Sequence, residues 1–265
     1  MTGRRVLITG AAGGLGAALT AAFTSRGDQV LTTDRPGTGA DLELDVTSDS
    51  DWARALDAVR ERWGGLDILV NNAGVAGGGR VDRATIEEWR WITDINLFGV
   101  VRGVATFAAL FKEQGSGEIV NIASLAGLVH PAGMGSYNAV KAAVVAFTET
   151  VGHELAQYGV HAHVVCPSYF RTNLMASMQG ADSALAGVMS VLVEQSPISA
   201  EDIADAVLAG IDAGDDVIVP DDAARLAVGL KRDDRAAYDA VMRKQARKLN
   251  AIADATPESG SDGAR

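Results

Sequence analysis

The sequence has little cysteine, few aromatic residues and no long apolar run. Cys166 is the only cysteine in 265 residues, so no disulfide can form within the chain, and the composition fits a reducing cytoplasm. Aromatic residues make up 5% of the chain against 30 glycines, which is typical of a globular enzyme with many tight turns. We find no run of 18 apolar residues, and the apolar run in MTGRRVLITG is too short for a signal peptide. We therefore expect a cytoplasmic protein without a membrane-spanning segment.

Positive charge is also scarce. The chain has 23 lysines and arginines against 34 aspartates and glutamates, a net charge of −11, which argues against binding to nucleic acid or to an anionic membrane. The four histidines include His161 and His163, which would share one face of a strand, but no third ligand is suggested nearby. We predict no metal site.

Short apolar runs alternate with amphipathic stretches along residues 4 to 220. The predicted strands are 5–9, 30–33, 42–44, 66–70, 118–122, 161–165 and 217–219, and the predicted helices are 14–25, 49–63, 86–112, 137–158 and 200–213. This alternation predicts an α/β fold of the Rossmann type, a doubly wound parallel sheet of about seven strands with helices on both faces. No linker interrupts it, so we expect one domain over 1–220.

A glycine-rich turn joins the first strand to the first helix. It reads TGAAGGLG at 9–16, with glycines at positions 10, 13, 14 and 16. Glycines there let the backbone approach a pyrophosphate at the helix N-terminus, although the spacing is not the G-x-G-x-x-G of other dinucleotide folds. The alternative is a simple tight turn.

Asp34 ends the second strand about twenty residues after the glycines. A carboxylate there accepts both hydroxyls of an adenosine ribose and repels a 2′-phosphate, which favours NAD. Arg35 follows directly, and a guanidinium in that turn would pair with the 2′-phosphate of NADP. Asp34 would also suit an ordinary turn. We favour NAD, with NADP as the alternative.

Tyr137 and Lys141 are four residues apart in a predicted helix, so they share one helix face. An ammonium about 5 Å from a phenol, at an effective dielectric of about 20, favours tyrosinate by roughly 3 kcal/mol, or about two pKa units. Desolvation opposes this shift. The pair is a candidate general acid and base. Alone the spacing is weak, because a surface lysine above a core tyrosine gives the same pattern.

Other polar residues stand where strands or helices meet the predicted site. Asn71 opens the sequence NNAG at 71–74, which suits close approach to the adenosine side of a cofactor or an ordinary turn. Asn96 lies inside a long helix, where a buried amide should bind a partner such as a relay water. Ser124 ends the fifth strand, where its hydroxyl would reach a substrate oxygen or serve only the local structure.

This ordered set resembles the short-chain dehydrogenase/reductase family, in its compact single-domain branch. The matching motifs are TGAAGGLG at 9–16, Asp34, Asp45-Val46, NNAG at 71–74, Asn96, Ser124 and YNAVK at 137–141. The resemblance implies that Tyr137 exchanges the proton of the substrate oxygen and that Lys141 lowers its pKa and binds the nicotinamide ribose. It further implies that Ser124 holds the substrate oxygen and that Asn96 fixes a relay water.

The resemblance also implies a cofactor site. The Phe170 backbone and the Thr172 hydroxyl would hold the nicotinamide carboxamide. Residues expected to bind the cofactor are Gly10, Ala12, Gly13, Gly14, Leu15, Gly16, Asp34, Arg35, Asp45, Val46, Asn71, Ala73, Gly74, Tyr137, Lys141, Pro167, Phe170 and Thr172.

Two departures from the family pattern stand out. The family's Pro-Gly after the sixth strand is Pro167-Ser168 here, with Thr172 at the matching place. The chain also continues beyond residue 220 with a basic stretch, which predicts a helical extension at 221–254 with a solvated or an interacting face, and then a disordered tail at 255–265.

The segment 173–196 would fold over the substrate as a lid. It is rich in methionine, leucine and valine, so it favours an apolar or bulky substrate, although these residues would equally bury the lid against the body. Arg171 is a cation near this segment. Residues expected to contact the substrate are Ser124, Val129, Met134, Tyr137 and Met175.

We therefore predict an NAD-dependent oxidoreductase that interconverts a secondary alcohol and a ketone. The alternatives are an NADPH-dependent carbonyl reductase of the same fold and a dinucleotide-sensing protein without turnover. The helices at 86–112 and 137–158 are long, and the second is rich in small residues, so we also expect a homodimer or homotetramer.

Overall fold

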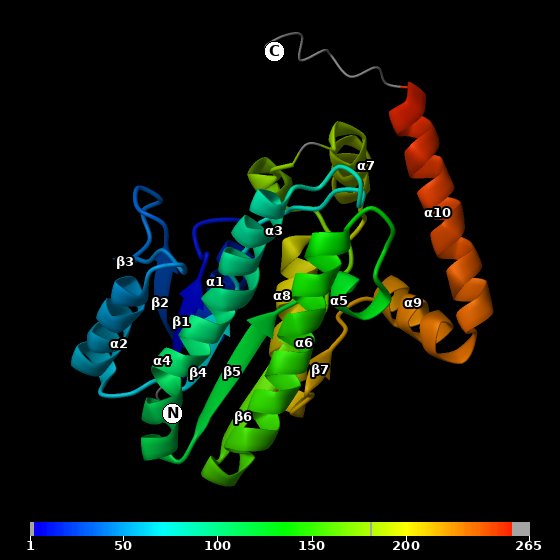
Figure 1. Cartoon of the computed structure of the whole chain (residues 1–265). Helices are drawn as coiled ribbons and strands as arrows, with labels where there is room; N and C mark the ends of the chain where they lie inside the picture. The colour runs from blue at the N-terminus through cyan, green and yellow to red at the C-terminus, as the bar shows by residue number, and fades with distance from the viewer. Residues whose placement is uncertain (1–2, 181, 256–265) are drawn as a thin grey trace.

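A computed structural model describes residues 3–180 and 182–255 and shows a seven-stranded sheet between two layers of helices (Figure 1). The strands are β1 Arg5–Thr9, β2 Gln29–Asp34, β3 Leu42–Glu43, β4 Ile68–Asn71, β5 Gly117–Ile122, β6 Val160–Val165 and β7 Val217–Ile218. All pairs are parallel, in the order β3-β2-β1-β4-β5-β6-β7. The predicted fold class and strand number are confirmed.

The helices cover both faces of this sheet. They are α1 Gly14–Ser25, α2 Asp49–Trp63, α3 Ile86–Thr93, α4 Gly99–Gln114, α5 Ala126–Val129, α6 Gly135–Leu155, α7 Ser183–Glu194, α8 Ala200–Ala213, α9 Asp222–Asp233 and α10 Arg235–Ala255, with η1 Asp94–Phe98, η2 Ala156–Tyr158 and η3 Asn173–Ser177. In Figure 1, α2, α4 and α6 lie in front of the sheet, and α1 and α8 pack behind it.

The central strands carry apolar residues on both sides because both faces are covered. Ile8 of β1 faces the layer of α1 and α8, while Leu7 next to it faces the layer of α2 and α4. Polar residues fix where helices begin: Thr85 and Glu88 form a capping box for α3, and Ser199 and Asp202 form one for α8. These capping boxes define the residues at which α3 and α8 begin.

The strand order reverses at β1, so the helices that follow β1 and β4, α1 and α4, lie on opposite faces of the sheet. In a doubly wound sheet, ligands bind in the crevice at such a reversal. The lid segment forms η3 and α7 above this edge, and α10 stands beside α7 (Figure 1). The predicted helical extension is thus α9 and α10. The predicted tail, apart from Ala255, lies outside the described residues, as does residue 181 of the lid.

α3, η1 and α4 form one continuous helical stretch, Ile86–Gln114. By length and composition alone this stretch could cross a membrane, although it contains no uninterrupted run of 18 apolar residues. However, 44% of its most apolar window is buried in this domain. Core helices such as this one pass the same test, because the side that covers a sheet is apolar.

Candidate active site

A cavity of about 1130 Å³ runs along the carboxyl edge of the sheet. Most predicted site residues line it. On its nucleotide side these are Gly10, Gly13, Gly14, Leu15, Asp34, Arg35, Asp45, Val46, Ala73, Gly74, Pro167, Phe170 and Thr172, and on its substrate side Ser124, Val129, Met134, Tyr137, Lys141 and Met175. Four predicted residues are not among the lining residues, namely Ala12, Gly16, Asn71 and Asn96.

The glycine-rich turn has the backbone shape that a diphosphate needs. Gly10 and Gly14 have φ angles of +65° and +53°, which side chains disfavour. A Cβ on Gly14 would lie 2.7 Å from the Thr172 hydroxyl, and one on Gly13 would lie 2.8 Å from the Asn173 amide nitrogen. The polar side chains of Thr172 and Asn173 therefore lie opposite backbone without side chains at the start of α1. A site of this kind suits the phosphates of a dinucleotide.

Gly16 and Ala12 support this turn from outside the cavity. A side chain on Gly16 would collide with the Gly10 carbonyl, so Gly16 allows α1 to pack closely against the turn. The Ala12 N–H donates to Asp34 Oδ2 at 2.9 Å. The second Asp34 oxygen accepts the N–H of Arg35 at 2.7 Å. Asp34 is thereby fixed at the cavity rim, with the exposed Arg35 beside it.

Asn71, predicted to contact the cofactor, is not among the residues that line the cavity. It is the last residue of β4, is 3% exposed, and donates through Nδ2 to Asn121 Oδ1 of β5 at 2.8 Å. Asn121 in turn donates to the Thr148 hydroxyl of α6 at 2.9 Å. The next residue, Asn72, lines the cavity instead, with Nδ2 2.8 Å from the Thr9 carbonyl oxygen.

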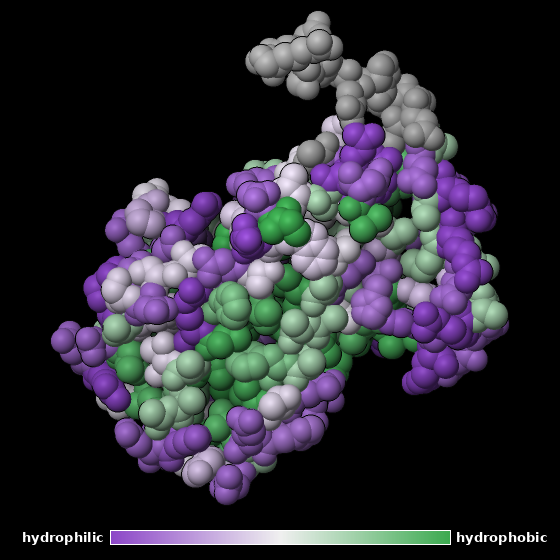
Figure 2. Space-filling model, in the orientation of Figure 1, coloured by the Kyte–Doolittle hydropathy of each residue, from purple (hydrophilic) through white to green (hydrophobic). Residues whose placement is uncertain are grey.

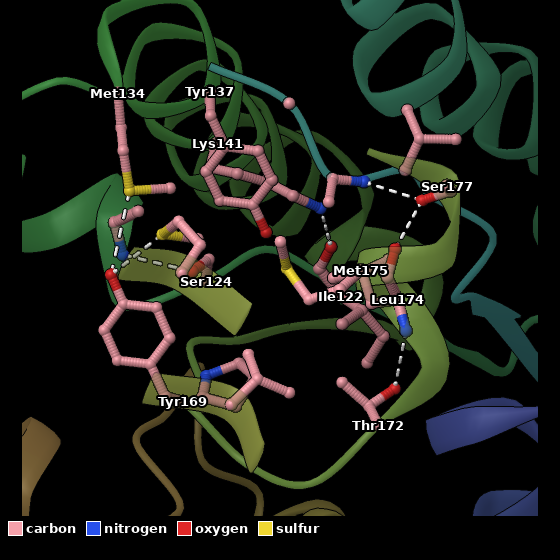
Figure 3. A pocket seen from close by; sticks show the side chains of 18 of the residues that line it. Ile122, Ser124, Met134, Tyr137, Lys141, Tyr169, Thr172, Leu174, Met175 and Ser177 are labelled. Atoms are coloured by element: carbon pink, nitrogen blue, oxygen red, sulfur yellow. Dashed lines mark hydrogen bonds between the residues drawn. The ribbon is translucent and has the colours of Figure 1, made fainter. Parts of the chain in front are cut away.

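Ser124, Tyr137 and Lys141 are brought together on the substrate side (Figure 3). The Lys141 Nζ donates to the Ile122 carbonyl at 2.9 Å and lies 5.8 Å from the centre of the Tyr137 ring. The Ser124 side chain lines the same cavity as Tyr137, where it acts to lower the pKa of the phenol. Helical spacing places the phenol and ammonium on one face of α6, and the end of β5 supplies the serine and a carbonyl.

The predicted direction of the pKa shift of Tyr137 is wrong. Burial raises the pKa of Tyr137 to about 12, although the Ser124 side chain opposes the rise. Burial also lowers the pKa of Lys141 to about 8. The simple Coulomb argument failed because both groups are buried, and desolvation outweighs their attraction. Tyr137 is thus a neutral proton donor at neutral pH.

Asn96 is held by two hydrogen bonds to one residue of the loop after β4. It lies in η1, a π-helical turn, and is fully buried. Its Oδ1 accepts the Val75 N–H at 2.8 Å, and its Nδ2 donates to the Val75 carbonyl at 2.9 Å. The side chain therefore holds the loop after β4, which lines the cavity, and its predicted role in fixing a relay water stays a prediction.

The lid is tied to the body by a buried ion pair. Arg80 Nε lies 2.7 Å from Asp182 Oδ2, and the Asp182 side chain is 1% exposed. Asp182 also caps α7 by accepting the Leu185 N–H at 3.2 Å. The Ser177 hydroxyl of η3 accepts the Ala76 N–H at 3.0 Å (Figure 3). These contacts hold the lid over the substrate side.

The C-terminal helices form part of the cavity wall, which the sequence did not reveal. Leu249 of α10 is 7% exposed and belongs to the same apolar cluster as Tyr137, Met134 and Leu185. Lys231 of α9 donates to the Leu128 carbonyl, and its Nζ lies 3.0 Å from His130 Nδ1. Residues of the extension that line the cavity are Ala227, Met242, Gln245, Lys248, Leu249 and Ile252.

No group of three or more histidine, cysteine, aspartate or glutamate side chains converges anywhere in residues 3–180 and 182–255. His163 is buried, and its ring nitrogens lie 2.8 Å from the Asp215 carbonyl oxygen and 3.3 Å from a Glu118 carboxylate oxygen. His161, two residues before it on β6, is exposed.

Comparison with known proteins identifies the family. Residues 4–182 match the family model for short chain dehydrogenases. A 3-oxoacyl-(acyl-carrier-protein) reductase, FabG, of Vibrio cholerae is 31% identical over 191 residues, 67% of this chain and 78% of the relative. A 3-alpha-(or 20-beta)-hydroxysteroid dehydrogenase of Mycobacterium tuberculosis is 33% identical over 184 residues, 65% of this chain and 71% of the relative.

A solved structure agrees. A short chain dehydrogenase/reductase from Burkholderia phymatum in complex with NAD aligns with a TM-score of 0.81 at 30% identity, over 88% of this chain and 94% of that one. The chain belongs to the short-chain dehydrogenase/reductase family of oxidoreductases that act on CH–OH groups with NAD(P). The predicted family and enzyme class are confirmed.

Proposed function

We propose that this protein interconverts a secondary alcohol and a ketone, with NAD as cofactor. The arrangement of Tyr137, Ser124 and Lys141 at one end of the dinucleotide crevice carries the proposal. The glycine turn and the Thr172 region would hold the cofactor, which supplies the hydride acceptor or donor. Relatives with a bound NAD or NADP support a nicotinamide dinucleotide in this crevice.

The residues would handle the proton and the oxygen. In the reductive direction Tyr137, with a pKa of about 12, donates its proton to the oxygen as carbon receives the hydride. Ser124 holds that oxygen by a hydrogen bond, and the Lys141 ammonium stabilises the tyrosinate left behind. In the oxidative direction the alcohol proton returns to tyrosinate. Asn96 acts as a positioning residue through Val75.

The cavity favours an apolar or bulky substrate. Its substrate side is walled by the apolar cluster that includes Met134, Leu185, Met189 and Leu249. Such a wall offers little to compensate a buried charge. Two relatives are named as a 3-oxoacyl-(acyl-carrier-protein) reductase and a hydroxysteroid dehydrogenase, and acyl chains and steroid rings are bulky apolar groups, which supports this proposal.

We favour NAD over NADP because Asp34 is fixed at the rim by two backbone N–H groups. Its charge would meet the 2′-position of the adenosine ribose. Titration with NADH and NADPH tests this choice. Clear preference for NADPH would identify the alternative, an NADPH-dependent carbonyl reductase.

Ketones and alcohols of graded size, assayed with NADH and NAD, test the reaction itself. Turnover should rise with apolar bulk. If the dinucleotide binds while no ketone or alcohol in the series reacts, the protein is better described as a dinucleotide sensor. Tyr137→Phe is the control, because it keeps the packing and removes the proton donor, so it should abolish turnover and leave dinucleotide binding.

We further propose a homo-oligomer that pairs through α4 and α6. Figure 2 shows an apolar patch on the face where these helices lie in Figure 1. Phe98, just before α4, is 49% exposed, and alanines 105 and 109 of α4 and 139 and 146 of α6 are exposed. Small residues allow two such faces to approach closely. Sedimentation should give a dimer or tetramer, and a monomer would contradict the proposal.

A further inference from the structure

The Tyr169 hydroxyl has only weak hydrogen-bond partners at the substrate cavity. Tyr169 lines the cavity just after β6, and its hydroxyl lies 3.5 Å from Met189 Sδ and 3.7 Å from Met134 Sδ (Figure 3). Within residues 3–180 and 182–255 these sulfurs are its hydrogen-bond partners. A thioether is a weak acceptor, and the phenol oxygen's own acceptor capacity is unused. A phenylalanine would fill the same space without a buried polar atom.

The ring is held in place by its backbone and not by its hydroxyl. The Tyr169 carbonyl accepts a hydrogen bond from the Ser196 hydroxyl at 2.7 Å, which joins the chain just before the lid segment to the end of that segment. Burial raises the pKa of the phenol, so it is a neutral donor. Methionine side chains are unbranched and adaptable, so both can yield to an oxygen that enters.

The hydroxyl is close to the proposed reaction centre. Tyr169 packs against the apolar cluster that includes Tyr137, and both phenols face the cavity that contains Ser124 (Figure 3). A ketone oxygen held by Tyr137 and Ser124 therefore places neighbouring atoms of the substrate toward Tyr169. Arg171 donates to the Ser196 carbonyl at 2.7 Å and is not among the residues that line the cavity.

We propose that Tyr169 selects ketones that carry a second, uncharged oxygen near the reacting carbonyl. The hydroxyl donates a hydrogen bond to that oxygen and so orients an otherwise apolar substrate. This inference rests on the proposed alcohol–ketone function and deepens it: the substrate class becomes a keto ester, diketone or hydroxyketone. A site that provides a buried hydrogen-bond donor discriminates against the analogue that lacks the acceptor.

The test compares heptan-2-one with ethyl 3-oxobutanoate, which has the same chain length and a second carbonyl, in wild type, Tyr169→Phe and Tyr158→Phe. Tyr158 is exposed at the end of η2, directly after α6, and serves as the matched control. Tyr169→Phe should raise KM for the keto ester about tenfold or more and leave kcat/KM for heptan-2-one within about twofold. Tyr158→Phe should change neither.

Equal losses on both substrates would make Tyr169 a packing residue, and no change on either would remove it from recognition; each result overturns the inference. If wild type reduces heptan-2-one and not the keto ester, the inference falls while the proposed function stands. If wild type reduces neither ketone nor any in the graded series, the proposed function fails and Tyr169 loses its assigned role with it. Thermal unfolding of Tyr169→Phe within about 2 °C of wild type would confirm that the comparison is between folded proteins.

Discussion

The Asn96 amide binds both backbone groups of Val75, its Oδ1 2.8 Å from the nitrogen and its Nδ2 2.9 Å from the oxygen. One buried side chain of the long helix thus fixes the loop that begins at the end of β4 and borders the cavity. The π-helical turn at η1 is the local irregularity that holds Asn96 there.

Asn96→Ala should therefore destabilise the protein as well as weaken its site. Each unpaired buried backbone group costs about 1–3 kcal/mol. Denaturant unfolding measures that loss, and dinucleotide titration measures the effect on the loop. A positioning role leaves the pH profile of kcat unchanged. A pH profile that shifts while stability and binding stay as in wild type would instead show a proton-relay role for the side chain.

The pKa of about 8 at Lys141 predicts a pH limit on ketone reduction. Above that pH the ammonium loses its proton and no longer stabilises the tyrosinate that forms as Tyr137 donates. The reductive rate should fall as pH rises through about 8. Lys141→Met should remove this fall from the pH–rate profile and lower kcat roughly 100-fold or more. A wild-type rate that stays level to pH 10 would contradict the assigned role of Lys141.

Linkage gives the same two groups opposite effects on stability. The folded pKa of Lys141 lies below its ordinary value of 10.5, so its burial penalty fades and stability rises between about pH 8 and 10.5. The folded pKa of Tyr137 lies above its ordinary value of 10, so stability falls as pH rises from 10 to about 12. Unfolding measured against pH should therefore show no rise in stability between about pH 8 and 10.5 in Lys141→Met. It should show no fall in stability between pH 10 and about 12 in Tyr137→Phe.

The sequence predicted the sheet and the main catalytic cluster because both depend on local patterns. Apolar runs marked the strands, and four-residue spacing put Tyr137 and Lys141 on one helix face. It chose Asn71 over Asn72 because strand register was not known. β4 extends through Asn71, whose register partner is Asn121 of β5, so consecutive amides point to different places. The pKa balance depends on burial, which no spacing predicts. The position of α10 against the cavity depends on contacts across more than 100 residues.

Asp34→Asn should move cofactor choice toward NADPH. Asparagine keeps an oxygen to accept the Ala12 N–H but removes the charge that would repel a 2′-phosphate, and Arg35 stays beside it. We expect the ratio of NADPH to NADH affinity to rise about 10- to 100-fold. The double variant with Arg35→Gln should lose most of this gain. An unchanged ratio in Asp34→Asn would rule out Asp34 as the discriminating residue.

Arg80→Gln should loosen the lid. It leaves the Asp182 carboxylate buried without its ion-pair partner, at a cost of about 3 kcal/mol. KM should rise more than kcat falls, and proteolysis within 173–196 should become faster. Arg90→Gln, which breaks the exposed pair with Glu87 on α3, is the matched control and should have no measurable effect. Equal behaviour of the two variants would show that the Arg80 pair does not hold the lid.

The same pair predicts a response to acid. Burial raises the pKa of Asp182, but hydrogen bonds from Arg80 and from the Leu185 N–H lower it by more, so the net shift is downward from 3.8. Its stabilisation is therefore complete above the unfolded value of 3.8 and is lost as pH falls through the lower folded value. Proteolysis of the lid should speed up in that acidic range in wild type and be fast throughout in Arg80→Gln.

Leu249→Ala tests whether α10 closes the substrate cavity. Leu249 packs close to Gly133, where a Cβ would lie 2.5 Å from Leu249 Cδ2, and Gly133 belongs to the loop that leads into α6 and Tyr137. Removing the side chain should lower the free energy of unfolding by about 2–5 kcal/mol because Leu249 is buried. It should also enlarge the substrate cavity, since Leu249 forms part of its wall. Bulky ketones should then gain in kcat/KM relative to small ones. Leu226→Ala, at a side chain 75% exposed on α9, should change stability by less than about 0.5 kcal/mol and leave the size preference intact. If Leu249→Ala lowers stability and leaves the ranking of ketones by size as in wild type, α10 supports the fold without shaping the substrate site.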